Sequence, residues 1–153
     1  MQFENELMQQ IKATAALLKL DEYVIEKDYF LTKAIGTIID IQNPNYRLVF
    51  QGGTCLAKAH NIIDRISEDS DFRIQLINDK FASKEQEYKL LKEFRKSIIT
   101  KLKNNNFVIH DEDFQVFNEG KSMSIRVAYP STFAQIKHIK PYLAMDFFLG
   151  MLG

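Results

Sequence analysis

Residues 69 to 76 alternate between two kinds of side chain, and this pattern commits the chain to a fold that contains a sheet. Apolar side chains stand at Phe72, Ile74 and Leu76, whereas the positions between them are charged or polar. Successive side chains of a strand point to opposite faces, so the pattern predicts a strand that is buried on one face only. The other face carries acids and is free to meet solvent or a polar ligand.

Patterns of helical period precede and follow this strand. Apolar residues recur at helical spacing in three long segments, and Asp21 is a candidate N-cap for the second of them. Because helices lead and strands cluster late, we predict an α+β fold with a mixed sheet packed against helices. The predicted helices are 3–19, 22–40, 54–61 and 83–104, and the further predicted strands are 47–51, 107–110, 113–118, 122–129 and 142–149.

Composition indicates one domain without a membrane span. The 153 residues are 46% hydrophobic and carry 20 basic and 20 acidic side chains, so a strongly basic nucleic-acid binder is not indicated. The single Cys55 excludes an internal disulfide, and the apparent lack of a leader or a membrane-spanning run predicts a cytoplasmic protein. An apolar run ends the chain, so we expect residues 1–153 to be one domain truncated at its C-terminus.

Three aspartates are candidates for a metal site. Asp69 and Asp71 are two residues apart in the predicted strand, so their carboxylates project from one face. Mg²⁺ would relieve their repulsion, since hard cations prefer carboxylate oxygens. Asp146 is the lone acid in the apolar strand 142–149 and is the candidate third ligand, or the base for an acceptor hydroxyl. The alternative is that all three acids lie on solvated strand edges.

A glycine turn precedes the acidic pair. Gly52, Gly53 and Thr54 follow a short strand and open a predicted helix, an arrangement that exposes backbone N–H groups to a phosphate. Each of these features alone is more often a plain turn or a surface charge, and the ordered set is more specific than any member. The remaining candidates for phosphate contact are Lys58, Arg65 and Ser67.

These motifs resemble those of a known family. Gly52-Gly53-Thr54-x-Leu56-x-Lys58, followed by Arg65-x-Ser67-Glu68-Asp69-x-Asp71-Phe72, is similar to the AbiEii/AbiGii family of bacterial nucleotidyltransferase toxins. Glu26-Lys27-Asp28-Tyr29 resembles the signature that this family carries on an early helix. The resemblance is good over residues 20 to 75 and carries no motif from 76 to 140.

The resemblance implies a polymerase-β-like nucleotidyltransferase fold, Mg²⁺ and a nucleoside triphosphate. It implies that Asp69 and Asp71 bind the metal, that Asp146 completes the site, and that Gly53 and Thr54 form the nucleotide-binding turn beside Ser67. It also implies an RNA acceptor such as tRNA and a cognate antitoxin, the partner of a type IV abortive-infection toxin. Family proteins are usually longer, with a helical C-terminal part, so the acceptor-binding region has no counterpart here.

Two rival hypotheses stay open beside nucleotidyl transfer. The chain is alternatively an inactive or truncated relative that binds nucleotide or a partner without turnover. A third reading is kinase-like transfer of the γ-phosphate, which uses similar parts. For Glu26-Lys27-Asp28 we favour a structural role that packs the helix against the nucleotide turn. A basic cluster of Lys137, His138 and Lys140 near Asp146 would meet RNA phosphates or stand in a solvated turn.

Overall fold

We describe the protein from a computed structural model, which covers residues 2–51, 62–63, 66 and 69–150. Three long helices are described: α1 (Gln2–Leu18), α2 (Glu22–Ile38) and α4 (Lys84–Asn104), with a short 3-10 turn, η1 (Asp111–Asp113). The strands are β1 (Tyr46–Phe50), β2 (Ser70–Leu76), β3 (Phe114–Phe117), β4 (Ser122–Val127) and β5 (Leu143–Gly150). None of the helices in these ranges is long and apolar enough to cross a lipid bilayer.

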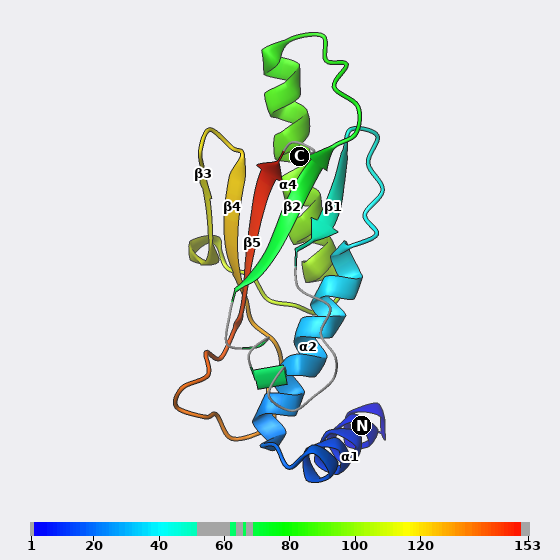
Figure 1. The fold of residues 1–153 in the computed structure, drawn as a ribbon, viewed down its shortest axis with the longest axis vertical. Coiled ribbons are helices and arrows are strands. Elements are labelled where there is room, and N and C mark those ends of the chain that lie inside the picture. Colours follow the sequence, from blue (N-terminus) through cyan, green and yellow to red (C-terminus); the bar gives the residue numbers. More distant parts are fainter. Residues whose placement is uncertain (1, 52–61, 64–65, 67–68, 151–153) are drawn as a thin grey trace.

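Within the described residues, the strands form one sheet in the order β1-β2-β5-β4-β3 (Figure 1). Strands β2 and β5 run parallel at its centre, and the remaining neighbours are antiparallel. The prediction of a mixed α+β fold is therefore confirmed. Because β2 and β5 are far apart in the sequence, this parallel pairing brings residues 70–75 beside residues 145–150.

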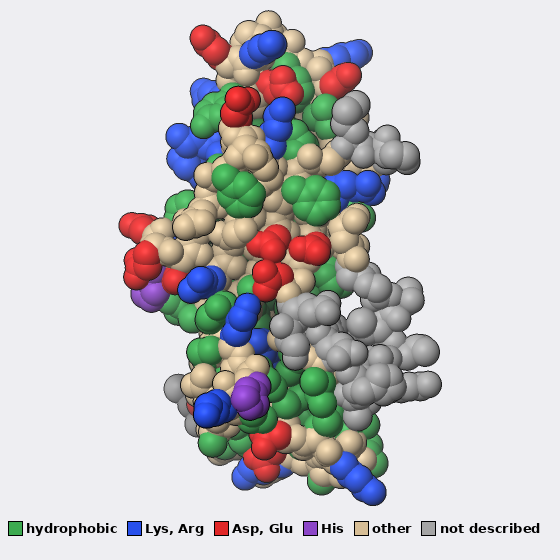
Figure 2. All heavy atoms as spheres, turned by 60° about the vertical axis from the view of Figure 1, so that its left-hand side comes forward, with side chains coloured by type: hydrophobic (Ala, Val, Ile, Leu, Met, Phe, Trp, Pro, Cys, Tyr) green, Lys and Arg blue, Asp and Glu red, His purple; other side chains and the backbone are tan. Residues whose placement is uncertain are grey.

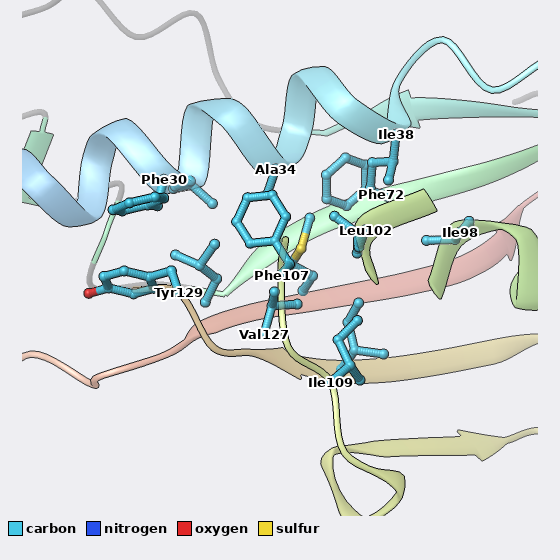
Figure 3. Packing of buried hydrophobic residues seen from close by; sticks show 14 of the residues in the cluster. Phe30, Ala34, Ile38, Phe72, Ile98, Leu102, Phe107, Ile109, Val127 and Tyr129 are labelled. Carbon is cyan, nitrogen blue, oxygen red and sulfur yellow. The ribbon is translucent and has the colours of Figure 1, made fainter. Parts of the chain in front are cut away.

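Helices α2 and α4 contact each other, and their apolar side chains join one face of the sheet in a common core (Figure 3). Each helix begins at an N-cap side chain. The predicted cap Asp21 accepts a hydrogen bond from the backbone N–H of Tyr23, and Ser83 accepts one from the backbone N–H of Gln86. Ala34 of α2 and Phe72 of β2 are fully buried there. The opposite face of the sheet has no helix packed on it among the described elements, so its side chains are free to form a site.

Two details of the sequence prediction are wrong. Residues 107–110 make only a single bridge, between Val108 and Ala128, because the chain turns into η1 directly after them. The helical spacing of apolar residues over 83–104 predicts that Tyr88 lies on the buried stripe of α4, yet its side chain is 52% exposed. The first turns of α4 extend beyond the end of the sheet (Figure 1), and the Tyr88 ring lies close to Gly120 with its remaining surface open to solvent. The predicted helix 54–61 lies outside the described residues.

Candidate functional site

A polar row crosses the open face of the sheet. Asp71 of β2 is the register partner of Asp146 of β5, and Asp146 is in turn the partner of Ser124 of β4. Gln115 of β3 continues the row as the partner of Ser124. Partners on adjacent strands point to the same face, so four polar side chains lie side by side across four strands. The register therefore places Asp71 and Asp146 side by side on adjacent strands.

The row leads into a pocket of about 300 Å³ on this face. Asp69, which directly precedes β2, joins Asp146 in its wall, and Ser124 lies between them and β3. Two further acids, Glu112 and Asp113, also line the pocket, and its basic and aromatic side chains are Arg126, Lys140 and Tyr142. Figure 2 shows acidic side chains gathered near the middle of one face, with Lys and Arg side chains close by. The pocket thus combines carboxylates with cations that could hold an anionic ligand.

The protonation of Asp146 reflects this setting. Burial raises the pKa of Asp146 above its usual range, and the neighbouring Asp69 and Asp71 raise it further. A hydrogen bond from Ser124 acts in the opposite direction and lowers the pKa. Without a cation, the surroundings of Asp146 therefore favour its protonated form more than water does.

Cationic side chains from two elements line the same pocket. The Nζ atom of Lys140 lies 3.8 Å from Oδ1 of Asp69, and both side chains are about half exposed. Lys140 and Arg126 both lie over the ring of Tyr142, at 6.0 and 5.1 Å from its centroid. An exposed ion pair of this kind adds little to stability. Its position matters more, because the ion pair sets a positive charge beside the acidic row.

Helix α2 reaches the site through Lys27. The Lys27 side chain is only 4% exposed, and its Nζ donates a hydrogen bond of 2.8 Å to the backbone oxygen of Lys140. Burial lowers the pKa of Lys27 to about 8, and the charge of Lys140 acts in the same direction, whereas Asp69 raises it. Lys27 also lines a small pocket beside Asp69 and Tyr142. The motif at 26–28 therefore borders the acidic site.

Sequence reasoning missed several of these residues. Ser124 and Arg126 lie on a strand that was predicted, at positions two apart on its polar face, and that alternation was the available signal. Tyr142 stands four positions before Asp146, a spacing that predicts one face of the strand 142–149, and it lines the same pocket. Of the predicted basic cluster, Lys140 lines the pocket, whereas Lys137 and His138 are exposed and are not among its lining residues.

The predicted nucleotide-binding residues all lie outside the described residues. They are Gly52, Gly53, Thr54, Lys58, Arg65 and Ser67. Ile66, between two of them, is buried and lines the small pocket together with Lys27 and Asp69. Gln51 donates its backbone N–H to the oxygen of Asp71 at 2.8 Å, so the chain leads away from β1 at the level of the acidic row.

The donor chemistry of the site fits a hard divalent cation, since Asp69, Asp71 and Asp146 offer carboxylate oxygens on neighbouring strands. As the side chains stand, no group of three acid, histidine or cysteine side chains among the described residues is arranged to hold a metal ion. Asp69 and Asp71 are exposed, so their side chains would have to turn towards Asp146 before the three carboxylates could share a cation.

Carboxylates on the open face of a mixed sheet, flanked by lysine and arginine, are a site suited to a cation and an anionic ligand together. Comparison with protein families identifies the chain more closely. The model of the family described as nucleotidyl transferase AbiEii toxin, type IV toxin–antitoxin system, matches residues 37–152, and the chain therefore belongs to this family. Searches of curated proteins and of solved structures gave no significant match.

Proposed function

We propose that this protein transfers a nucleotidyl group from a nucleoside triphosphate to an acceptor hydroxyl, with Mg²⁺ as its cofactor. The observation that carries the proposal is the register pair of Asp71 and Asp146 on adjacent parallel strands, with Asp69 in the wall of the same pocket as Asp146. The AbiEii family is a nucleotidyltransferase family, which supports the same reaction. The mixed sheet with its acids on the open face is in keeping with a polymerase-β-like nucleotidyltransferase fold.

In this proposal Asp69, Asp71 and Asp146 hold the cation. When bound, Mg²⁺ would neutralise phosphate charge and polarise the reacting oxygens. The acceptor oxygen forms a bond to the α-phosphorus, the bond from that phosphorus to the bridging oxygen breaks, and pyrophosphate leaves. The acceptor's proton passes to a carboxylate, and Asp146 is the candidate for this role if Asp69 and Asp71 alone hold the cation. Lys140 and Arg126 would contact phosphate oxygens at the pocket.

The proposal extends to the substrates and partners, and membership of the family supports an antitoxin and a nucleotide. A nucleoside triphosphate is the donor, an RNA such as tRNA is the proposed acceptor, and a cognate antitoxin is the proposed partner of this type IV toxin. The predicted turn of Gly52, Gly53 and Thr54 would hold the triphosphate, with Lys58, Arg65 and Ser67 as further contacts. We place these events in the cytoplasm, where nucleotides and tRNA occur together.

The test is transfer of label from each of the four triphosphates, labelled at the α-phosphate, to total bacterial RNA in the presence of Mg²⁺. Asp71→Asn should lower the rate by about 100-fold or more, because a carboxylate that would hold the cation is lost. Asp79→Asn is the matched control, since Asp79 is an exposed aspartate beyond the other end of β2. Equal activity of wild type and Asp71→Asn would refute the proposed role of the acidic row.

The same assay separates the rival functions. A second reaction with label on the γ-phosphate should leave the RNA unlabelled and release labelled pyrophosphate. Label that reaches the acceptor from the γ-position would show kinase-like transfer instead. Mg²⁺-dependent nucleotide binding by calorimetry, with no label transferred from either position, would identify an inactive relative that binds without turnover.

A further inference from the structure

Two adjacent residues of α2 hold the two ends of the connection between β4 and β5. Glu26 is 1% exposed and accepts hydrogen bonds from Ser131 Oγ, from Thr132 Oγ1 at 2.9 Å and from the Thr132 backbone at 2.8 Å. Lys27 is 4% exposed and donates to the backbone oxygen of Lys140 at 2.8 Å. The first bonds fix the start of the connection, and the last one fixes its end, just before β5.

The bond made by Lys27 lies at the acidic site, whereas those of Glu26 lie away from it. Lys140 carries the ammonium group that lies 3.8 Å from the carboxylate of Asp69. Its backbone oxygen is the one that Lys27 binds, so a shift of the main chain at Lys140 would carry this ammonium group with it. Pro141 follows, and β5 with Asp146 begins two residues later, at Leu143.

Stability alone does not account for a lysine at this position. Burying an ammonium group is costly unless it is well paired, and an apolar side chain of similar length would fill the same space without that cost. The described contacts give Lys27 a carbonyl partner and the more distant charge of Asp69, with the repulsion of Lys140 opposing it. A buried charge in such surroundings is expected where it serves a site.

We propose that Lys27 is a positioning residue for nucleotidyl transfer: its hydrogen bond to the backbone of Lys140 holds the Lys140 ammonium group beside Asp69 at the acidic row. This inference rests on the proposed function, because it assigns Lys27 a part in the same reaction. Lys27 acts through Lys140 and need not touch the substrate. Partners of this kind behind a metal or phosphate site typically change affinity or activity by about 10- to 100-fold when they are removed.

The principal test is a set of steady-state measurements on the full chain with wild type, Lys27→Met and Lys27→Arg. Lys27→Met should lower kcat/KM for the triphosphate by about 10- to 100-fold, because the Lys140 ammonium group is no longer held beside the acidic row. Lys27→Arg, which keeps a charged donor, should recover most of the rate. Lys33→Met is the control, since Lys33 is an exposed lysine further along α2. A wild-type rate in Lys27→Met would overturn the proposal.

A double substitution tests the route through Lys140. If Lys27 acts by holding Lys140, then Lys27→Met should have little further effect once Lys140→Met has removed the ammonium group. Losses that multiply in the double variant would mean that Lys27 works by another route and would overturn the proposal. Lys33→Met combined with Lys140→Met should leave the rate of Lys140→Met unchanged.

Hydrogen–deuterium exchange decides the anchoring without any turnover. Peptides spanning residues 136–142 should exchange faster in Lys27→Met than in wild type or Lys33→Met, because the bond to the Lys140 backbone is lost. Unchanged exchange would overturn the anchoring, even for a wild type that transfers no label. A wild type without transfer would refute the proposed function separately. If Lys27→Met fails to fold, Lys27→Leu, which also lacks a hydrogen-bond donor, replaces it in every arm.

Discussion

The protonation of Asp146 gives a prediction for a single residue. Burial raises the pKa of Asp146 above the ordinary value of 3.8, so the folded protein holds this proton more tightly than the unfolded chain does. The free energy of unfolding should therefore fall as the pH rises from 3.8 through the raised pKa. Asp146→Asn removes the destabilisation that comes with ionising Asp146. The melting temperature of this variant at pH 7 without divalent cations should therefore be higher than that of wild type.

Thermal unfolding between pH 4 and 8 measures the difference. The gap between Asp146→Asn and wild type should widen with pH, and Mg²⁺ should raise the melting temperature of wild type more than that of the variant, because a cation offsets the repulsion of the carboxylates. Asp79→Asn, at an exposed position, should follow the wild-type curve. Parallel curves for wild type and Asp146→Asn would show that Asp146 has an ordinary pKa.

At the scale of elements, the connection between β4 and β5 depends on one carboxylate. Glu26 accepts three hydrogen bonds from Ser131 and Thr132. Glu26→Gln replaces an accepting oxygen with an N–H₂ group that faces donors, so the free energy of unfolding should fall by about 1–3 kcal/mol. Urea denaturation measures this loss. Glu119→Gln is the control at an exposed position, and equal denaturation midpoints for the two variants would contradict the anchoring role.

The sequence predicted the individual strands and helices better than it predicted the register of the strands and the packing of the helices. Alternation identified β2 and β5 and placed Asp71 and Asp146 on polar faces, because period two is a local property of a strand. The register that pairs the two aspartates is set by the whole sheet and could not be derived locally. The burial of Lys27 was also missed, since residues 23–27 are all buried and no single apolar stripe describes that part of α2.

At the scale of the molecule, the hydrophobic core crosses the boundary of the family match. The match begins at residue 37, yet α1 and α2 supply Ile11, Phe30 and Ala34 to the same buried cluster as Phe72 of β2. Figure 3 shows Ala34 at the surface of α2 that faces the rings of Phe72 and Phe107. A shared core of this kind predicts that the helices and the sheet unfold together, as one domain of 153 residues would.

Two substitutions on α2, two positions apart, test whether the helices and the sheet unfold in one transition. Ala34 is fully buried, so Ala34→Leu should overfill the core and lower the free energy of unfolding by about 1–3 kcal/mol. A Cβ atom added at Gly36 meets nothing within 4 Å, so Gly36→Ala should raise it by about 0.5–1 kcal/mol through helix propensity. In both variants, far-UV and near-UV circular dichroism should report one coincident transition. Separate transitions for the helical signal and the aromatic signal would show that α1 and α2 form a unit of their own.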